Sequence, residues 1–431
     1  MKKFSSYLIP SVVASVLISM YAIIDGIFIG QAVGDVGLAA INVAWPITAV
    51  LQSIGQALGL AGCICIQTHL GKGEIEKAEK LKLTTVIIVL IVSVVLGGLL
   101  FLTKEPLIKI LGSTEYSFQP AIDYIKIILM GSMFQMLGCS MIPLLKNSGK
   151  IKTAVGASLS AIGVNLLLDY LLIMVLDMGL IGAAIGSVLA QMISAGVCLI
   201  AYFKEFKGVD FSITNIKNIL TTSLAPLILA YSYSLVIIFT NISCKNFGGD
   251  EAIAAYTLLS YICYIYIAST CAVGDSIQPL FSFNEAKGDF IENKKMLRKC
   301  LIISTSICVV YGFILVILRN PLGDLYNLSE VATSYYLDGL VYYLIGGLLL
   351  GVIKVVSSYF YATNKKIKAN LLVFLDPFVL TPLGLLLFTA IFDLYGVWIT
   401  YLFVHVNLLI TAVVLVLDNK KIFQKASSID D

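Results

Sequence analysis

The chain has 431 residues, of which 59% are hydrophobic and only 13% are charged, and its mean hydropathy is +0.95. This composition excludes an ordinary soluble globular protein and indicates a polytopic membrane protein. The net charge of +3 comes without a basic stripe of interleaved aromatic residues, so we expect the lipid bilayer, and no nucleic acid, as a partner.

Nearly uncharged stretches of about 20 residues recur along the whole chain, and each is long enough to cross a hydrocarbon core of about 30 Å. Twelve such stretches predict an all-α membrane protein with twelve transmembrane helices. Their approximate ranges are 5–33, 37–68, 83–103, 118–144, 153–176, 179–203, 218–246, 252–282, 300–318, 335–361, 369–391 and 395–417.

The distribution of basic residues predicts the orientation of these helices. Most of the 29 Lys and Arg residues fall on the side of the N-terminus, whereas the opposite side holds only Lys104, Lys109, Lys245 and Arg319. By the positive-inside rule, both termini are therefore cytoplasmic. The first span is longer than the apolar part of a signal peptide and ends without a small-residue cleavage site, so we expect it to be retained.

The two halves of the chain are similar to each other at a shift of 216 residues. Leu8-Ile9-Pro10 corresponds to Leu224-Ala225-Pro226, and Lys150-Ile151-Lys152 corresponds to Lys366-Ile367-Lys368. Because each half holds an even number of spans, both halves enter and leave on the same side, which predicts parallel six-helix repeats. The predicted domains are an N-terminal lobe with the cation-coupling site (1–205), a cytoplasmic linker (206–217), a C-terminal lobe (218–418) and a cytoplasmic tail (419–431).

Two carboxylates of the first half lie inside spans. Asp25 belongs to the first span and Asp169 to the fifth, each about 10 to 12 Å below the outer boundary at 1.5 Å per residue. Ionisable residues at such depth usually face the bundle interior or water and mark ion or substrate pathways. The alternative is that they are separate polar residues with packing roles.

Further oxygen-bearing side chains are expected at the same depth. Asn165 lies one helical turn before Asp169, Tyr21 lies one turn before Asp25, and Ser187 returns to this level in the sixth span. Two carboxylates with amide and hydroxyl oxygens suit a small hard cation such as Na⁺. The same pair can bind H⁺ instead, because neighbouring carboxylates in a low dielectric favour the uptake of one proton.

The second half carries its own membrane charges. Asp275, Lys354 and Asp376 share a level in the inner half of their spans, where they form either a structural ion-pair cluster or an inner gate that contacts charged substrate. Pro377, directly after Asp376, predicts an interruption of the eleventh helix. His405 in the last span is expected to be a packing residue rather than a proton carrier.

Several short motifs, taken together and in this order, resemble the multidrug and toxic compound extrusion (MATE) transporters of the MOP flippase superfamily. The resemblance covers essentially all twelve spans. The motifs are Pro10 fifteen residues before Asp25, the stretch Asp25-Gly26-Ile27-Phe28-Ile29-Gly30, the Asn165-x-x-x-Asp169 spacing, the run Gly182-Ala183-Ala184-Ile185-Gly186-Ser187, and Gln278-Pro279-Leu280-Phe281-Ser282-Phe283-Asn284.

This resemblance implies a V-shaped pair of six-helix lobes in the plasma membrane of a prokaryote. It implies a monomer without a cofactor that exchanges amphipathic, often cationic, organic compounds for H⁺ or Na⁺ by alternating access. The ion-coupling positions that it implies are Asp25, Asn165, Asp169 and Ser187, with Tyr21 nearby and Pro10 as the bend of the first helix. The family often has Thr at the position of Ser187, and the acid that some members carry in the seventh helix has no match here.

Two other functions remain open at this stage. A flippase for lipid-linked saccharides would favour basic residues in its cavity, for which Lys126 and Lys354 are the candidates. An intramembrane aspartyl protease would use Asp25 and Asp169 as a dyad, but the expected Gly-x-Gly-Asp sequence is absent. The chain also lacks HExxH and Walker A sequences, which argues against a zinc protease and an ATP-driven pump and favours a gradient-driven transporter over an enzyme.

Overall fold

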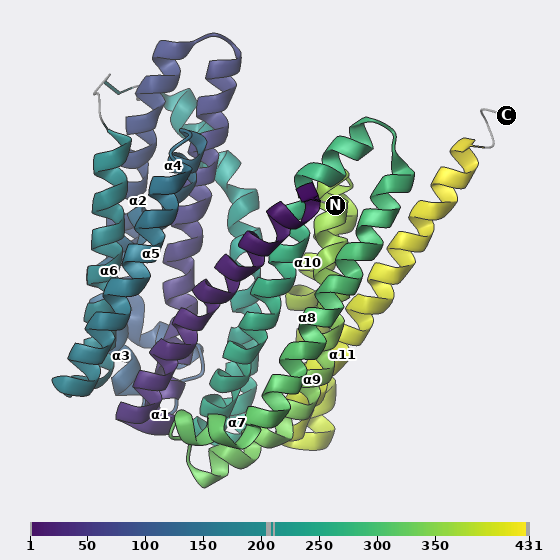
Figure 1. Cartoon of the computed structure of the whole chain (residues 1–431). Coiled ribbons are helices and arrows are strands. Elements are labelled where there is room, and N and C mark those ends of the chain that lie inside the picture. The colour runs from purple at the N-terminus through teal and green to yellow at the C-terminus, as the bar shows by residue number, and fades with distance from the viewer. Residues whose placement is uncertain (1, 204–207, 210–211, 428–431) are drawn as a thin grey trace. The chain divides into compact units, whose positions relative to one another are not determined.

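The computed structural model describes residues 2–203, 208–209 and 212–427. All regular elements in these ranges are helices (Figure 1), which confirms the all-α prediction. In chain order they are α1 (Lys2–Gly71), α2 (Ile75–Ile110), α3 (Glu115–Met130), α4 (Ser132–Asn147), α5 (Ile151–Asp169), the π-helix η1 (Tyr170–Val175), α6 (Gly179–Tyr202), α7 (Ile213–Ala286), α8 (Phe290–Leu325), α9 (Glu330–Ala362), α10 (Lys366–Leu375), the π-helix η2 (Asp376–Leu380) and α11 (Thr381–Ser427).

The helices of the described residues accommodate the twelve predicted spans. Eight stretches are long and apolar enough to cross a membrane, and the pair α3 and α4, bent by 61°, makes a ninth. Three of these stretches contain a break, at Gly34 in α1, Gly249 in α7 and Asp393 in α11. Because a helix of 70 residues is far longer than the hydrocarbon core is thick, each break separates two crossings.

The internal repeat extends to the backbone conformation of the turns. Residues with positive φ end the helical segments at matching places in the two halves, as is common for helix termini. The matching pairs, at shifts of 215 or 216 residues, are Gly34 and Gly249, Gly73 and Gly288, Gly112 and Asn327, Gly149 and Asn364, and Asp177 and Asp393. The turns that connect the spans are thus built alike in both halves.

Gly34 occupies a backbone conformation that only glycine adopts readily, with φ 69° and ψ −153°. We expect Gly34→Ala to lower the free energy of unfolding by about 1 to 3 kcal/mol, because a Cβ atom is strained in this region. Gly98→Ala is the matched control, since an added Cβ there would meet nothing within 4 Å. Thermal unfolding of the purified variants measures the difference, and equal stability of the two variants would contradict the assigned strain.

The contacts divide the chain into two compact units. Unit 1 comprises Met1–Ile24 and Ser243–Asp431, and unit 2 comprises Asp25–Ile242. The divisions thus fall inside the first span of each half, whereas the predicted boundary between the lobes lies at 206–217. The reason is packing. The beginning of the first span in each half packs against helices from the other half of the chain and is therefore grouped with them.

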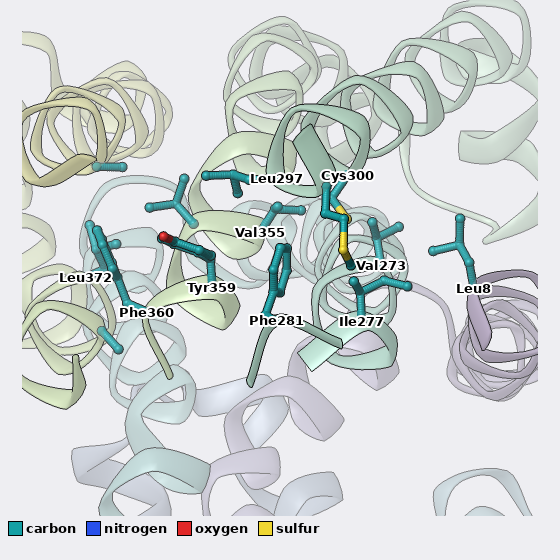
Figure 2. Packing of buried hydrophobic residues seen from close by; sticks show 14 residues of the cluster. Leu8, Val273, Ile277, Phe281, Leu297, Cys300, Val355, Tyr359, Phe360 and Leu372 are labelled. Atoms are coloured by element: carbon teal, nitrogen blue, oxygen red, sulfur yellow. The ribbon is translucent and has the colours of Figure 1, made fainter. Parts of the chain in front are cut away.

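The core of unit 1 shows this packing directly. Leu8 of α1 is buried in one cluster with Val273 and Ile277 of α7 (Figure 2). In the same cluster the rings of Phe281 and Tyr359 meet edge to face, with their centroids 5.3 Å apart. Helix α9 connects this core to the rest of the unit, since it packs along both α8 and α11.

Close helix packing in unit 2 depends on small residues. A Cβ at Gly55 of α1 would lie 2.6 Å from the backbone oxygen of Met136, and one at Gly59 would lie 2.4 Å from that of Ser140, both in α4. Lipid tails are as apolar as the side chains, so helices in a membrane associate through close van der Waals packing, which small residues permit. Small residues likewise allow α6 to approach α5 closely at the candidate site.

Candidate ion-coupling site

The fifth span holds Asn165 and Asp169 on one face of α5. Their exposed fractions are 1% and 0%, and Asn165 Nδ2 donates a hydrogen bond of 3.2 Å to Asp169 Oδ1. A spacing of four residues places the two side chains one above the other on a helix, as the sequence predicts. The amide therefore holds one carboxylate oxygen of Asp169 in a fixed orientation.

Asp25 of α1 lies directly beside this pair. The carboxyl groups of Asp25 and Asp169 lie close enough to interact directly. Neighbouring carboxylates in a low dielectric favour the uptake of one proton. The structure thus brings the two predicted acids together.

Neighbouring residues keep α1 against the end of α5. The rings of Phe28 and Tyr170, close in sequence to Asp25 and Asp169, have centroids 6.4 Å apart. The π-helix η1 begins at Tyr170, immediately after Asp169. Single π-helical turns are rare and occur frequently at functional sites, which agrees with a specialised role for this junction.

Helix α6 packs closely against the site at Gly186. A Cβ at Gly186 would lie 2.7 Å from Asp169 Oδ1, and one at Gly182 would lie 3.0 Å from the backbone of Leu172. Ser187, the residue of α6 that the sequence predicts at the site, is half-buried, and the described part of the chain shows no hydrogen bond from it to the site. The spacing of Gly182, Gly186 and Ala190 at intervals of four was the signal for this packing face.

The site has unused ligand oxygens. Asp25 Oδ1, Asn165 Oδ1 and Asp169 Oδ2 are buried and have no hydrogen-bond partner among the described residues. Buried polar atoms are rarely left without a partner, so such a group needs an explanation. Oxygen ligands of this kind fit a small hard cation such as Na⁺, and the carboxylate oxygens also fit protons.

The remaining predicted residues of this site are Tyr21 and Pro10. Both lie in α1, but their side chains fall outside the described part of the structure. Their roles, a site neighbour for Tyr21 and the bend of the first helix for Pro10, therefore stay predictions.

The three predicted charges of the second half do not form ion pairs with one another. Asp275 Oδ1 accepts hydrogen bonds of 2.8 Å from Ser358 Oγ and from Gln278 Nε2, and Asp376 Oδ1 accepts one of 2.7 Å from Thr381 Oγ1. None of the ion pairs within 4.0 Å in the described residues includes Lys354. Of the two alternatives, direct ion pairing is not found among the described residues, where hydroxyl and amide groups hydrogen-bond the two carboxylates.

Lys354 acts on its surroundings over a longer range. Its ammonium group interacts electrostatically with Asp275 and with His405. Asp376 also interacts electrostatically with His405. The histidine that the sequence suggested was a packing residue therefore lies within range of both signs of charge.

The chain is similar in sequence and in fold to known proteins. The MatE family model matches two segments, residues 10–171 and 226–383, which start 216 residues apart and so repeat the internal shift. The multidrug export protein MepA of Staphylococcus aureus (strain MRSA252) is 23% identical over 411 residues, which is 92% of this chain and 89% of that protein.

Two solved structures share the fold over nearly the whole chain. An inward-facing multidrug resistance MATE family transporter of the MOP superfamily superposes with a TM-score of 0.86 at 18% identity, covering 97% of this chain and 99% of that one. An outward-facing transporter of this family has a TM-score of 0.74 at 19% identity and coverages of 99% and 97%. Because the family model matches well over half of the sequence, the chain belongs to the MatE family.

Proposed function

We propose that the protein is a secondary active antiporter, not an enzyme, which exports amphipathic, often cationic, organic compounds in exchange for H⁺ or Na⁺ by alternating access. The observation that carries this proposal is the contact of Asp25 with Asp169 beside Asn165, deep inside unit 2. The name of the relative from Staphylococcus aureus, a multidrug export protein, supports the substrate class.

The chemistry of the site explains how a cation gradient could be coupled to export. Two ionised carboxylates in a low-dielectric interior cost several kcal/mol each, and a bound proton or Na⁺ removes much of this cost. The conformational change is then favoured when a cation is bound, and release of that cation on the other side completes the exchange. Asn165 contributes by orienting Asp169 rather than by carrying charge.

Transport by reconstituted protein tests the proposal. Purified full-length protein in proteoliposomes is loaded with ethidium as a cationic probe, and a pH gradient and a Na⁺ gradient are imposed separately. We expect ethidium flux above that of protein-free liposomes under one of the two gradients, which also identifies the coupling ion. Absence of flux with ethidium and with other amphipathic cations under either gradient would overturn the proposal.

We further propose that the protein is a monomer in the plasma membrane of a prokaryote with both termini cytoplasmic. The excess of Lys and Arg on the side of the N-terminus supports this orientation. A fluorescent protein fused to the C-terminus is expected to mature and emit, as it does when it remains in the cytoplasm. A periplasmic reporter such as alkaline phosphatase at the same position is expected to stay inactive, and the reverse pattern would contradict this topology.

A further inference from the structure

Helix α8 has one buried side and one exposed side. Met296, Leu297 and Cys300 are buried in the core of unit 1, where Figure 2 shows Leu297 and Cys300. The opposite side carries large apolar side chains that remain exposed, namely Ile302, Val309, Phe313 and Ile317. Helix α8 is long and apolar enough to cross a membrane, so this exposed apolar side lies against lipid hydrocarbon.

The lipid-facing side continues into a group of cations at the beginning of α8. Lys295, Arg298 and Lys299 are exposed. They precede Ile302 by three to seven residues, a spacing that keeps them on the same side of the helix. The predicted span begins at residue 300, so at 1.5 Å per residue these cations lie within about 8 Å of the hydrocarbon core. The headgroup region of one leaflet is about 5 to 8 Å thick, and the cations therefore lie at its level.

A buried asparagine fixes the rotation that points these cations outward. Asn293 is 1% exposed, and its Nδ2 donates hydrogen bonds to the backbone oxygen of Phe281 at 3.2 Å and to Glu285 Oε2 at 3.0 Å. The other carboxylate oxygen of Glu285 forms an ion pair of 3.4 Å with Lys365. Asp289 caps the helix by accepting a hydrogen bond from the backbone of the first turn. These two acids are thus already engaged near the cations.

Most of the cations have no acid of their own. Residues 290–299 hold four basic residues and one acid. The acid, Glu292, lies 4.0 Å from Lys295. None of the ion pairs within 4.0 Å in the described residues includes Lys294, Arg298 or Lys299. Long basic side chains keep their stems along apolar surface while the charged ends reach polar surroundings, so three charges remain available to an anionic partner.

The matching segment of the first half lacks this property. At the shift of 215 residues, 290–299 corresponds to 75–84 at the beginning of α2, which holds three Lys and two Glu. Each of the three lysines has a glutamate within 3.4 Å, in the pairs Lys77–Glu74, Lys80–Glu76 and Lys82–Glu79. The positive-inside rule applies to both connectors, so it does not explain why the cations are unpaired only in the second half.

We propose that the beginning of α8 binds phospholipids with anionic headgroups. Clustered Lys and Arg next to a membrane-spanning helix attract such headgroups, and the planar guanidinium of Arg298 suits a phosphate group. Ile291, one turn before Lys295, is 70% exposed, and its aliphatic side chain is favourable against lipid rather than in water. The proposal does not depend on the exported compound or the coupling ion. The assignment to the cytoplasmic leaflet rests on the topology proposed above.

Photocrosslinking locates the bound lipid in the intact protein. Full-length protein is placed in phosphatidylcholine nanodiscs with a small share of either phosphatidylglycerol or phosphatidylcholine that carries a diazirine near its headgroup. Mass spectrometry measures the crosslinked lipid on peptides that contain residues 290–299 and on peptides that contain residues 75–84. We expect the ratio of phosphatidylglycerol to phosphatidylcholine to be at least about threefold higher on the first peptides. Equal ratios at the two helix beginnings would overturn the proposal.

Two triple variants separate charge from the presence of long side chains. Lys294→Gln, Arg298→Gln and Lys299→Gln, combined in one protein, are expected to reduce the ratio at 290–299 to that at 75–84. The matched control, Lys294→Arg with Arg298→Lys and Lys299→Arg, keeps the charges and is expected to keep most of the difference. Thermal unfolding checks that both variants are folded. A difference that persists without the charges, or is lost in the control, would contradict a charge-based site.

The native protein provides a test that needs no substitution. Raising NaCl from about 50 mM to about 500 mM is expected to lower the ratio at 290–299 at least about twofold, because salt screens exposed charges. Inorganic phosphate at constant ionic strength is expected to leave the ratio unchanged, since it lacks the acyl chains that hold a headgroup at this depth. Displacement of the lipid by phosphate would assign the cations to a free anion and overturn the proposal. Absence of ethidium flux would contradict the antiport function alone.

Discussion

Asp169→Asn is expected to reduce gradient-driven ethidium export at least about tenfold, to the level of protein-free liposomes. The amide keeps the size of the side chain and can still hydrogen-bond Asn165, but it removes the charge that binds H⁺ or Na⁺. Asp25→Asn is expected to have a similar effect, because the two carboxyl groups act as a pair. Initial rates of ethidium flux in proteoliposomes under the coupling gradient measure the loss.

The control for this prediction is another Asp to Asn exchange in unit 2. Asp123 in α3 accepts a hydrogen bond from Gln119 at an exposed position, outside the candidate site. Asp123→Asn is expected to export at the native rate. Native export by both Asp25→Asn and Asp169→Asn would remove the two carboxylates from the coupling mechanism, whatever the substrate is.

Gly186→Val is expected to have the second large effect, although it adds only apolar atoms. The first of them, Cβ, would lie 2.7 Å from Asp169 Oδ1 and 3.4 Å from Asn165 Nδ2. Helix α6 must then move away from α5, or the carboxylate must leave Asp25. Overpacking of this kind costs about 1 to 3 kcal/mol, so we expect a lower melting temperature together with strongly reduced export.

Gly196 provides a control for Gly186 on the same helix. An added Cβ at Gly196 meets nothing within 4 Å, so Gly196→Val has the same change of composition without the collision. We expect this variant to keep most of its thermal stability and its ethidium export. If Gly186→Val were as stable and active as Gly196→Val, the close approach of α6 to Asp169 would not matter for function.

The architecture followed from the sequence because the relevant forces are local. A membrane-spanning helix is selected by about 20 consecutive apolar residues, whatever packs against it. The same holds for the turns, since positive φ at Gly34 and again at Gly249 depends on a residue without a Cβ. The all-α fold and the internal repeat were therefore confirmed.

The candidate site followed from the sequence only in part. Depth placed Asp25 and Asp169 at one level, and helical spacing placed Asn165 beside Asp169. The prediction did not identify Gly186 as the residue that faces Asp169, because neighbouring helical residues differ by about 100° in direction and depth in the membrane alone does not set the rotation of a helix. A shared depth in the membrane also suggested ion pairs of Lys354 with Asp275 and Asp376. In the structure, hydroxyl groups donate hydrogen bonds to these two carboxylates instead.

By itself, the sequence of this protein determined where the chain crosses the membrane, that its two halves are built alike, and which residues carry buried charge. These properties depend on transfer to hydrocarbon and on backbone sterics, which each segment satisfies alone. Only the tertiary structure decided that Asp25 lies beside Asp169, that Gly186 of α6 approaches Asp169, and that the beginning of each first span groups with the other half of the chain. Contacts of this kind depend on the rotation and close packing of helices far apart in the chain.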